Sequence, residues 1–127
     1  MSWCNRTLIQ LPFCLGFSTS EADYHKKLRY LEVAKEDWDS FLCSKTADAT
    51  THFFRDVDEN LCIIVTFGPR HKLSKEQTAA LITHEAVHVW QRAIKEMGED
   101  DPSKEFMAYG IQSITQTLLE LLWKKPV

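Results

Sequence analysis

The segment from Ser74 to Gly98 constrains the fold of this chain most, because signals for both ends of one long helix are present. Ser74 is a typical N-cap residue, and Gln77, three residues later, completes the pattern of a capping box. Gly98 is a typical residue for ending a helix. Apolar residues recur at helical spacing between these ends. The pattern therefore predicts one amphipathic helix between Ser74 and Gly98.

Two β-strands are predicted just before this helix. Thr51–Val57 and Leu61–Phe67 are rich in β-branched and aromatic residues, and Leu61–Phe67 is the strongest strand pattern in the chain. Asp58–Asn60 supplies turn residues between them, and Gly68–Pro69 ends the second strand. The two segments are therefore predicted to form a β-hairpin.

The first third of the chain predicts a strand and a helix. Thr7–Leu11 is a plausible first strand, and Pro12 places the residues after it in an edge or a loop. Ser20 is a typical N-cap residue, and apolar residues at helical spacing continue to about Cys43. We therefore expect one long amphipathic helix over this second segment.

A last helix is predicted near the C-terminus. Pro102 allows a new start at about Ser103, and apolar residues at helical spacing run to about Trp123. The whole pattern predicts an α+β fold with a long N-terminal helix, a small antiparallel sheet, the capped helix and this closing helix. At 127 residues, the length is that of a single domain over residues 1–127.

The capped helix carries a motif that points to a reaction. His84-Glu85-Ala86-Val87-His88 reads H-E-x-x-H, and residues four apart lie on the same face of a helix. His84 and His88 could therefore bind one Zn²⁺ together. Glu85 lies one step around the helix, where its carboxylate could take a proton from water. A pair of half-buried helix histidines without metal is the alternative interpretation.

A catalytic zinc needs three protein ligands, so a third side chain must reach the two histidines. Glu105 is the best candidate, because a tight turn from Gly98 to Pro102 lets the closing helix run back beside the capped helix. A glutamate favoured by the helix dipole in a first turn is the alternative explanation of Glu105. The other candidates for the third ligand are Glu99, Asp100, Asp101 and His71.

The pattern resembles the gluzincin metallopeptidases, in which H-E-x-x-H is followed by a glutamate on the next helix. The small size is similar to that of the minigluzincins and of small HExxH peptidases of bacteria and phages. The likeness covers the layout from about Thr51 to Leu122 but is specific only at His84, Glu85, His88 and Glu105. We expect no counterpart of the large C-terminal domain of thermolysin-like enzymes. The extended histidine motif of the metzincins is absent, because Gln91 and Ile94 follow His88 instead.

The resemblance implies a zinc-dependent hydrolysis of peptide bonds. Zinc would be held by His84, His88 and Glu105, and Glu85 would be the general base. Tyr109, four residues after Glu105, could help to polarise the substrate carbonyl, although a tyrosine there is more often part of a core. The strand Leu61–Phe67 is expected to line the cleft and pair with an extended peptide.

The composition narrows the other classes of function. A net charge of −3 argues against a nucleic-acid or anionic-membrane binder, and no apolar run approaches the length of a membrane span. The N-terminus lacks a secretory pattern, so we expect a cytoplasmic protein. The four cysteines have no C-x-x-C spacing and are expected to act as small apolar residues, with disulfides as the alternative. A zinc-stabilised binding module with weak or no catalysis is the alternative function.

Overall fold

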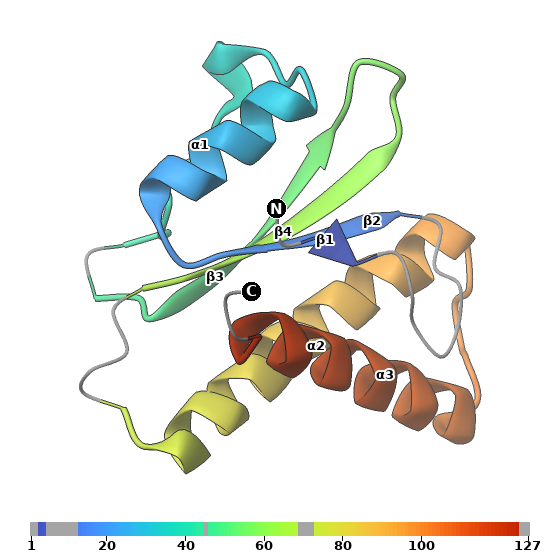
Figure 1. The fold of residues 1–127 in the computed structure, drawn as a ribbon. Coiled ribbons are helices and arrows are strands. Elements are labelled where there is room, and N and C mark those ends of the chain that lie inside the picture. The colour runs from blue at the N-terminus through green and yellow to red at the C-terminus, as the bar shows by residue number, and fades with distance from the viewer. Residues whose placement is uncertain (1–2, 5–12, 45, 69–72, 125–127) are drawn as a thin grey trace.

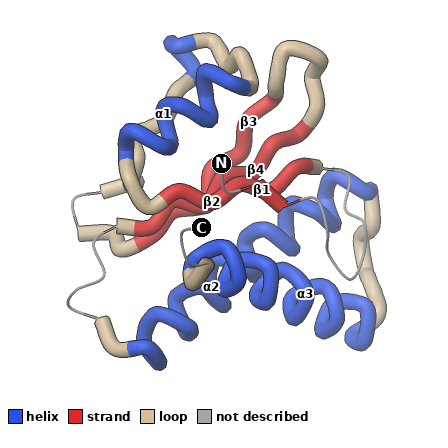
Figure 2. Tube along the Cα trace, in the orientation of Figure 1, coloured by secondary structure: helices blue, strands red, loops and turns tan. Residues whose placement is uncertain are grey.

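The computed structural model describes residues 3–4, 13–44, 46–68 and 73–124. A small β-sheet lies between two helical layers: helix α1 (Glu21–Tyr30) covers one face, and helices α2 (Lys75–Met97) and α3 (Lys104–Leu122) cover the other (Figures 1 and 2). This arrangement confirms the predicted α+β class. No helix among the described residues is long and apolar enough to cross a membrane.

The sheet is mixed, so the prediction of an antiparallel sheet is wrong. Its order is β1 (Trp3–Cys4), β2 (Cys14–Ser18), β4 (Leu61–Phe67) and β3 (Ala49–Arg55). The β3–β4 hairpin is antiparallel as predicted, but β2 runs parallel to β4. The parallel pair forms because α1 and the segment after it lead into β3, which runs opposite to β2. The β3–β4 hairpin then reverses the chain again, so that β4 runs in the same direction as β2. The predicted strand at Thr7–Leu11 lies outside the described residues.

Strand β4 is the centre of the molecule, and all seven of its residues are buried. Successive side chains of a strand point to opposite faces of the sheet. Leu61, Ile63, Val65 and Phe67 therefore join the core beneath α2 and α3. Cys62 and Ile64 join a second, smaller core beneath α1. This double burial explains why the segment has an unbroken apolar sequence rather than an alternating one.

Helix α1 is much shorter than the predicted helix from Ser20 to about Cys43. Ser20 caps its start as expected, but the helix ends at Tyr30. Glu32 adopts a left-handed backbone (φ 57°), and the N–H of Val33 donates to the carbonyl of Leu28, which closes the helix end. The apolar pattern continues because Trp38 and Phe41, further along, pack against the same small core without being helical.

Helices α2 and α3 agree with the predictions. The side chain of Ser74 accepts from the N–H of Gln77, and the side chain of Gln77 accepts from the N–H of Ser74, so the capping box is present. Gly98 ends α2 in the left-handed conformation (φ 73°). Ser103 caps α3, which then packs back against α2.

Candidate metal centre

The two motif histidines lie together on the exposed face of α2. Their Nε2 atoms are 3.2 Å apart, and the rings are nearly perpendicular. The side chain of His84 is 65% exposed, so an ion could reach it from solvent. In the described part of the chain, His84, Glu85 and His88 are the one group of three or more potential ligands whose ligand atoms all lie within 4.8 Å of one another.

The separation of the two nitrogens fits a shared metal ion. Zinc binds imidazole nitrogens at about 2.0–2.1 Å, and tetrahedral geometry then places two of them roughly 3.3 Å apart. The Nε2 atoms of His84 and His88 are at 3.2 Å. Without a metal, the same contact requires one ring to donate a hydrogen bond to the other. The pair of imidazoles is therefore suited to a transition-metal ion, since neutral imidazole is a common ligand of zinc, copper, iron and nickel.

Glu85 lies beside the histidines but is buried, with only 4% of its surface exposed. Its Oε1 accepts a hydrogen bond from the hydroxyl of Thr51 on β3 (3.1 Å). Its Oε2 is 4.0 Å from Nε2 of His84. The hydroxyl of Thr51 thus fixes one carboxylate oxygen, and the other faces the histidines. This is the orientation that a general base beside a metal needs.

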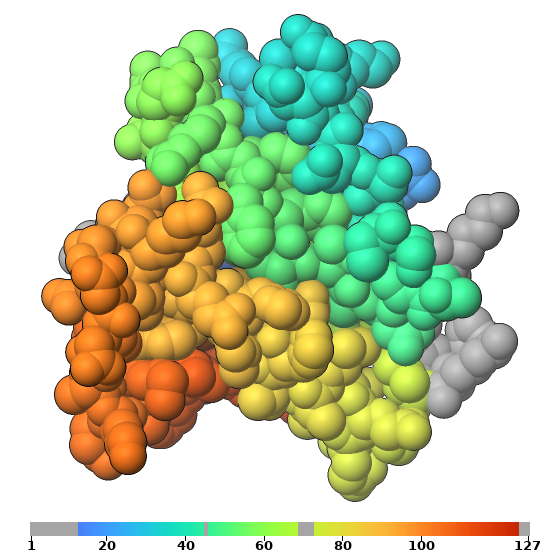
Figure 3. Space-filling view, turned by 180° about the vertical axis from the view of Figure 1, so that it is seen from behind, coloured from blue at the N-terminus to red at the C-terminus, as the bar shows by residue number. Residues whose placement is uncertain are grey.

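Strand β3 runs along α2 and is tied to it at three successive odd-numbered positions. Thr51 bonds to Glu85, Phe53 lies 5.3 Å from the guanidinium of Arg92, and Arg55 forms a bidentate ion pair with Glu96. Seen from behind, the green segment of β3 passes directly above the yellow and orange segment of α2 (Figure 3). The strand therefore forms one wall beside the histidines.

The outer edge of β3 has no partner strand among the described residues. The N–H of Gly68 donates to the carbonyl of Asp48, and the N–H of Asp56 donates to the carbonyl of Asn60. Because antiparallel partners alternate, the even-numbered residues of β3 turn their backbone groups toward β4. The odd-numbered residues, Thr51 among them, present their backbone N–H and C=O to the outer edge.

The expectation that Leu61–Phe67 lines the cleft is wrong. This strand is β4, which pairs with β2 on one side and β3 on the other, so it has no free edge for a peptide. Strand β3 occupies the edge instead. The sequence pattern identified both strands of the hairpin but contained no signal for which of them the neighbouring strand would cover.

Glu105 is not brought to the histidines. It is exposed in the first turn of α3 and does not belong to the group formed by His84, Glu85 and His88. Helix α3 packs on α2 through Phe106, whose ring centroid lies 5.1 Å from that of Trp90. Trp90 follows His88 by two residues, which is roughly 200° around a helix. The contact between the helices therefore lies on the side of α2 away from His88.

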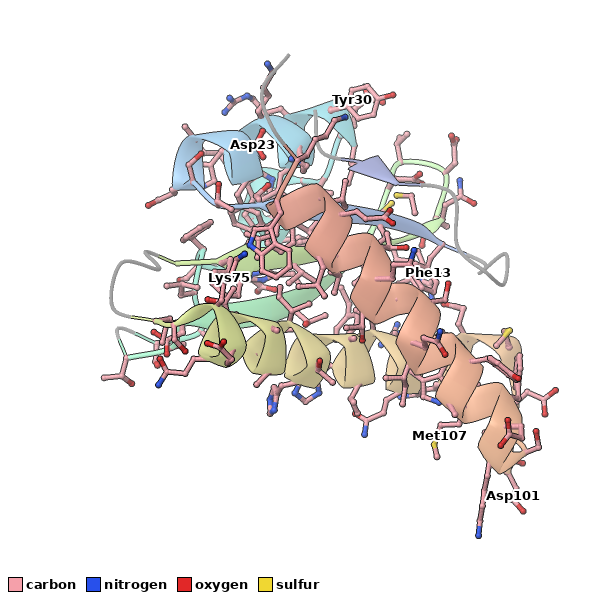
Figure 4. All side chains as sticks on the ribbon, turned by 60° about the horizontal axis from the view of Figure 1, so that its bottom comes forward. Phe13, Asp23, Tyr30, Lys75, Asp101 and Met107 are labelled. Atoms are coloured by element: carbon pink, nitrogen blue, oxygen red, sulfur yellow. The ribbon has the colours of Figure 1, made fainter. Side chains whose placement is uncertain are left out.

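The other predicted site residues also lie away from the histidines. Tyr109 is 51% exposed on α3, the helix that packs on the side of α2 away from His88. Glu99, Asp100 and Asp101 are exposed in the turn between α2 and α3. Figure 4 shows Asp101 at the end of the helical layer opposite Lys75, which begins α2. His71 lies outside the described residues.

Thr51 is the functional candidate that the sequence did not reveal. It begins the predicted strand Thr51–Val57, but it is 34 residues from Glu85, and no local pattern relates the two positions. Only the packing of β3 on α2 places the hydroxyl at the carboxylate. Comparison of the chain with models of protein families, with curated proteins and with solved structures found no match.

Proposed function

We propose that this protein is a zinc-dependent peptide hydrolase, with His84 and His88 as metal ligands and Glu85 as the general base. The observation that carries the proposal is the pair of imidazole nitrogens, 3.2 Å apart, beside a buried and oriented carboxylate. Burial of a carboxylate is unfavourable unless it is hydrogen-bonded. The Thr51 hydroxyl bonds to one oxygen of Glu85, and the other oxygen faces the histidines, which is compatible with a role as a base.

Zinc, when bound, would act as a Lewis acid toward water and a carbonyl oxygen. The protein groups supply the remaining steps. Glu85 would take the proton from the attacking water through the oxygen that faces the histidines, and then deliver it to the leaving amine. Thr51 would hold the other oxygen and so keep the carboxylate in position.

The free edge of β3 supports a peptide as the substrate. A peptide that adds to this edge as a further strand would receive backbone hydrogen bonds from odd-numbered residues such as Thr51. Its residue opposite Thr51 would then lie closest to Glu85. Such binding recognises the peptide backbone, which suits hydrolysis of unstructured chains rather than folded proteins.

The proposal uses two protein ligands, because Glu105 lies outside the group in this structure. A two-histidine site is expected to bind zinc more weakly than a site with three protein ligands. Zinc titration of Glu105→Gln tests the ligand role that the family resemblance implies. An affinity equal to that of the wild type removes Glu105 from the site, and a weaker affinity shows that α3 rearranges when zinc binds.

The test of the function combines metal analysis with the Glu85→Gln variant. We expect the wild-type protein to take up one zinc per chain and to hydrolyse unstructured peptides in a chelator-sensitive reaction. Glu85→Gln should keep the zinc and lose hydrolysis. The alternative is a zinc-stabilised binding module with weak or no catalysis. That alternative holds if zinc binds and raises the melting temperature but neither protein hydrolyses any peptide.

A further inference from the structure

A polar hollow lies beside the outer edge of β3, on the side of the sheet that faces α1. Its volume is about 290 Å³, and it is lined by residues of β3 and of the segment before it: Asp39, Ser40, Cys43, Thr50, Thr51 and His52. Thr51 is also the residue that bonds to Glu85. The hollow and the proposed reaction site therefore share one residue of β3, Thr51.

The walls of this hollow are held by hydrogen bonds. The ring of His52 is buried, and its Nε2 contacts the Thr66 hydroxyl (2.9 Å) and the Phe41 carbonyl (3.1 Å). The hydroxyl of Tyr24 on α1 donates to the backbone carbonyl of Asp39 (2.9 Å). The N–H of Cys43 donates to the Thr50 hydroxyl (2.9 Å). The segment before β3 is thus fixed against the strand, so the hollow has a defined shape.

The register of a bound peptide would direct one of its side chains into this hollow. Residues directly opposite each other on paired strands place their side chains on the same face of the sheet. Thr51 faces α2, whereas the ring of His52 faces α1, where it lies 4.9 Å from the ring of Tyr24. The peptide residue opposite His52 would therefore point its side chain into the hollow. It is the neighbour of the peptide residue opposite Thr51, which would lie closest to Glu85.

The charge of the hollow is negative. The carboxylate of Asp39 is 64% exposed, and its Oδ2 lies 3.8 Å from Nδ1 of His52. Burial lowers the pKa of His52, and this effect exceeds the opposing influence of the Phe41 carbonyl and Asp39. The imidazole is therefore neutral at pH 7 and does not cancel the carboxylate. A second carboxylate, that of Glu21, lines an adjoining hollow that also contains Ser40 and Cys43.

We propose that this hollow is a specificity pocket for a lysine or arginine side chain of an extended peptide bound along β3, at the position opposite His52. Asp39 supplies the anionic partner for the cation, and Ser40 and the Thr50 hydroxyl supply polar surface around it. The proposal rests on the peptide hydrolase function for its biological meaning. Peptide binding itself can be measured without hydrolysis.

The experiment uses the full chain with the Glu85→Gln substitution, loaded with zinc, so that peptides bind without being cleaved. Unstructured peptides that differ only by arginine, glutamine or glutamate at successive positions are titrated by fluorescence anisotropy. We expect one position at which arginine binds about two- to fivefold more tightly than glutamine, the range for a largely exposed ion pair. Asp39→Asn should remove this preference, and Asp39→Lys should transfer it to glutamate.

Asp37→Asn is the matched control, because it removes the same charge two residues away from an exposed position outside the hollow. It should leave the preference for arginine unchanged. The proposal of a specificity pocket is wrong if no position prefers arginine, if no peptide binds, or if the preference survives Asp39→Asn. The function is tested separately on the wild-type protein. Hydrolysis without an arginine preference rejects the pocket alone, and an arginine preference without hydrolysis rejects the enzyme alone.

Discussion

The hydroxyl of Thr51 on β3 donates a hydrogen bond to Oε1 of Glu85 on α2, over 3.1 Å and across 34 residues of sequence. This bond joins the edge strand β3 to helix α2 at Glu85, the residue that we propose as the general base. It also satisfies one oxygen of a carboxylate that is almost completely buried. The bond therefore contributes both to the stability of the fold and to the orientation of the proposed catalytic group.

Replacement of Thr51 by valine should affect stability and hydrolysis together. The change keeps the shape of the side chain but leaves the buried carboxylate without this donor, so we expect a loss of about 1–3 kcal/mol in the free energy of unfolding. Hydrolysis should fall about tenfold because Glu85 is less well oriented. Urea unfolding and peptide assays measure the two effects. Thr51→Ser, which keeps the hydroxyl, should resemble the wild type in both, and an equally impaired serine variant would contradict the role of the bond.

Zinc should stabilise the protein only while both motif histidines are present. A ligand that binds the folded state alone adds about 2.7 kcal/mol to the unfolding free energy at a hundred times its dissociation constant. Melting temperatures with zinc and with chelator should therefore differ for the wild type. The difference should disappear in His84→Ala and in His88→Ala. Gln91→Ala, an exposed change one turn further along α2, should keep it, and an unchanged zinc effect in both histidine variants would place the ion elsewhere.

Gly110 permits the close approach of α3 to α2. A Cβ atom at this position would lie 2.1 Å from Cζ3 of the Trp90 ring, which is buried and cannot easily move aside. Gly110→Ala should therefore destabilise the protein by about 1–3 kcal/mol through overpacking, despite the better helix propensity of alanine. Thermal or urea unfolding measures the loss. Gln112→Ala, on the exposed side of the same helix, should change stability by less than about 0.5 kcal/mol, and an equally stable Gly110→Ala variant would contradict the close packing.

Local signals in the sequence were sufficient for the elements around the site but not for their arrangement. The capping box at Ser74 and the left-handed Gly98 defined α2, because these interactions involve residues close in sequence. The end of α1 was missed because Glu32 adopts a left-handed backbone that its residue type does not signal. The same limit applies to the parallel pairing of β2 with β4, which depends on a contact between distant segments.

In the candidate site too, local features were predictable from the sequence, whereas contacts between distant segments were not. The spacing of His84 and His88 predicted that their rings would meet, since four residues make about one helical turn. The turn from Gly98 to Pro102 allowed α3 to run back beside α2, which it does, but the sequence did not determine the side of α2 on which α3 packs. That side depends on how Trp90 fits against Phe106 and Gly110, and spacing along the chain does not determine it. This is why Glu105, within reach by length alone, lies outside the group.

The ion pair between Asp23 and Lys27 on α1 makes a pH-dependent contribution to stability. Lys27 is fully buried, and its ammonium contacts the carboxylate of Asp23, which also accepts from the Ser18 hydroxyl (2.7 Å). Burial alone would raise the pKa of Asp23, but the hydrogen bonds from Lys27 and Ser18 and the charge of Lys27 outweigh it and lower that pKa. The folded protein therefore binds a proton at Asp23 less readily than the unfolded chain does.

The sign of the effect follows from that lowered pKa. Stability from Asp23 is fully present above the pKa of an unfolded aspartate, near 3.9, and is lost as the pH falls through the lower pKa of the folded state. Asp23→Asn should cost about 1–3 kcal/mol at pH 7, less than for a fully buried pair because Asp23 is one-third exposed. In urea titrations, the difference between the wild type and this variant should be constant from pH 7 to about 5 and should shrink below about pH 4.

Glu21→Gln, which removes an exposed carboxylate from the same helix turn, serves as the control and should show a much smaller difference at pH 7. A difference for Asp23→Asn that grows as the pH falls would mean that the carboxylate is destabilised, rather than stabilised, by its buried partner.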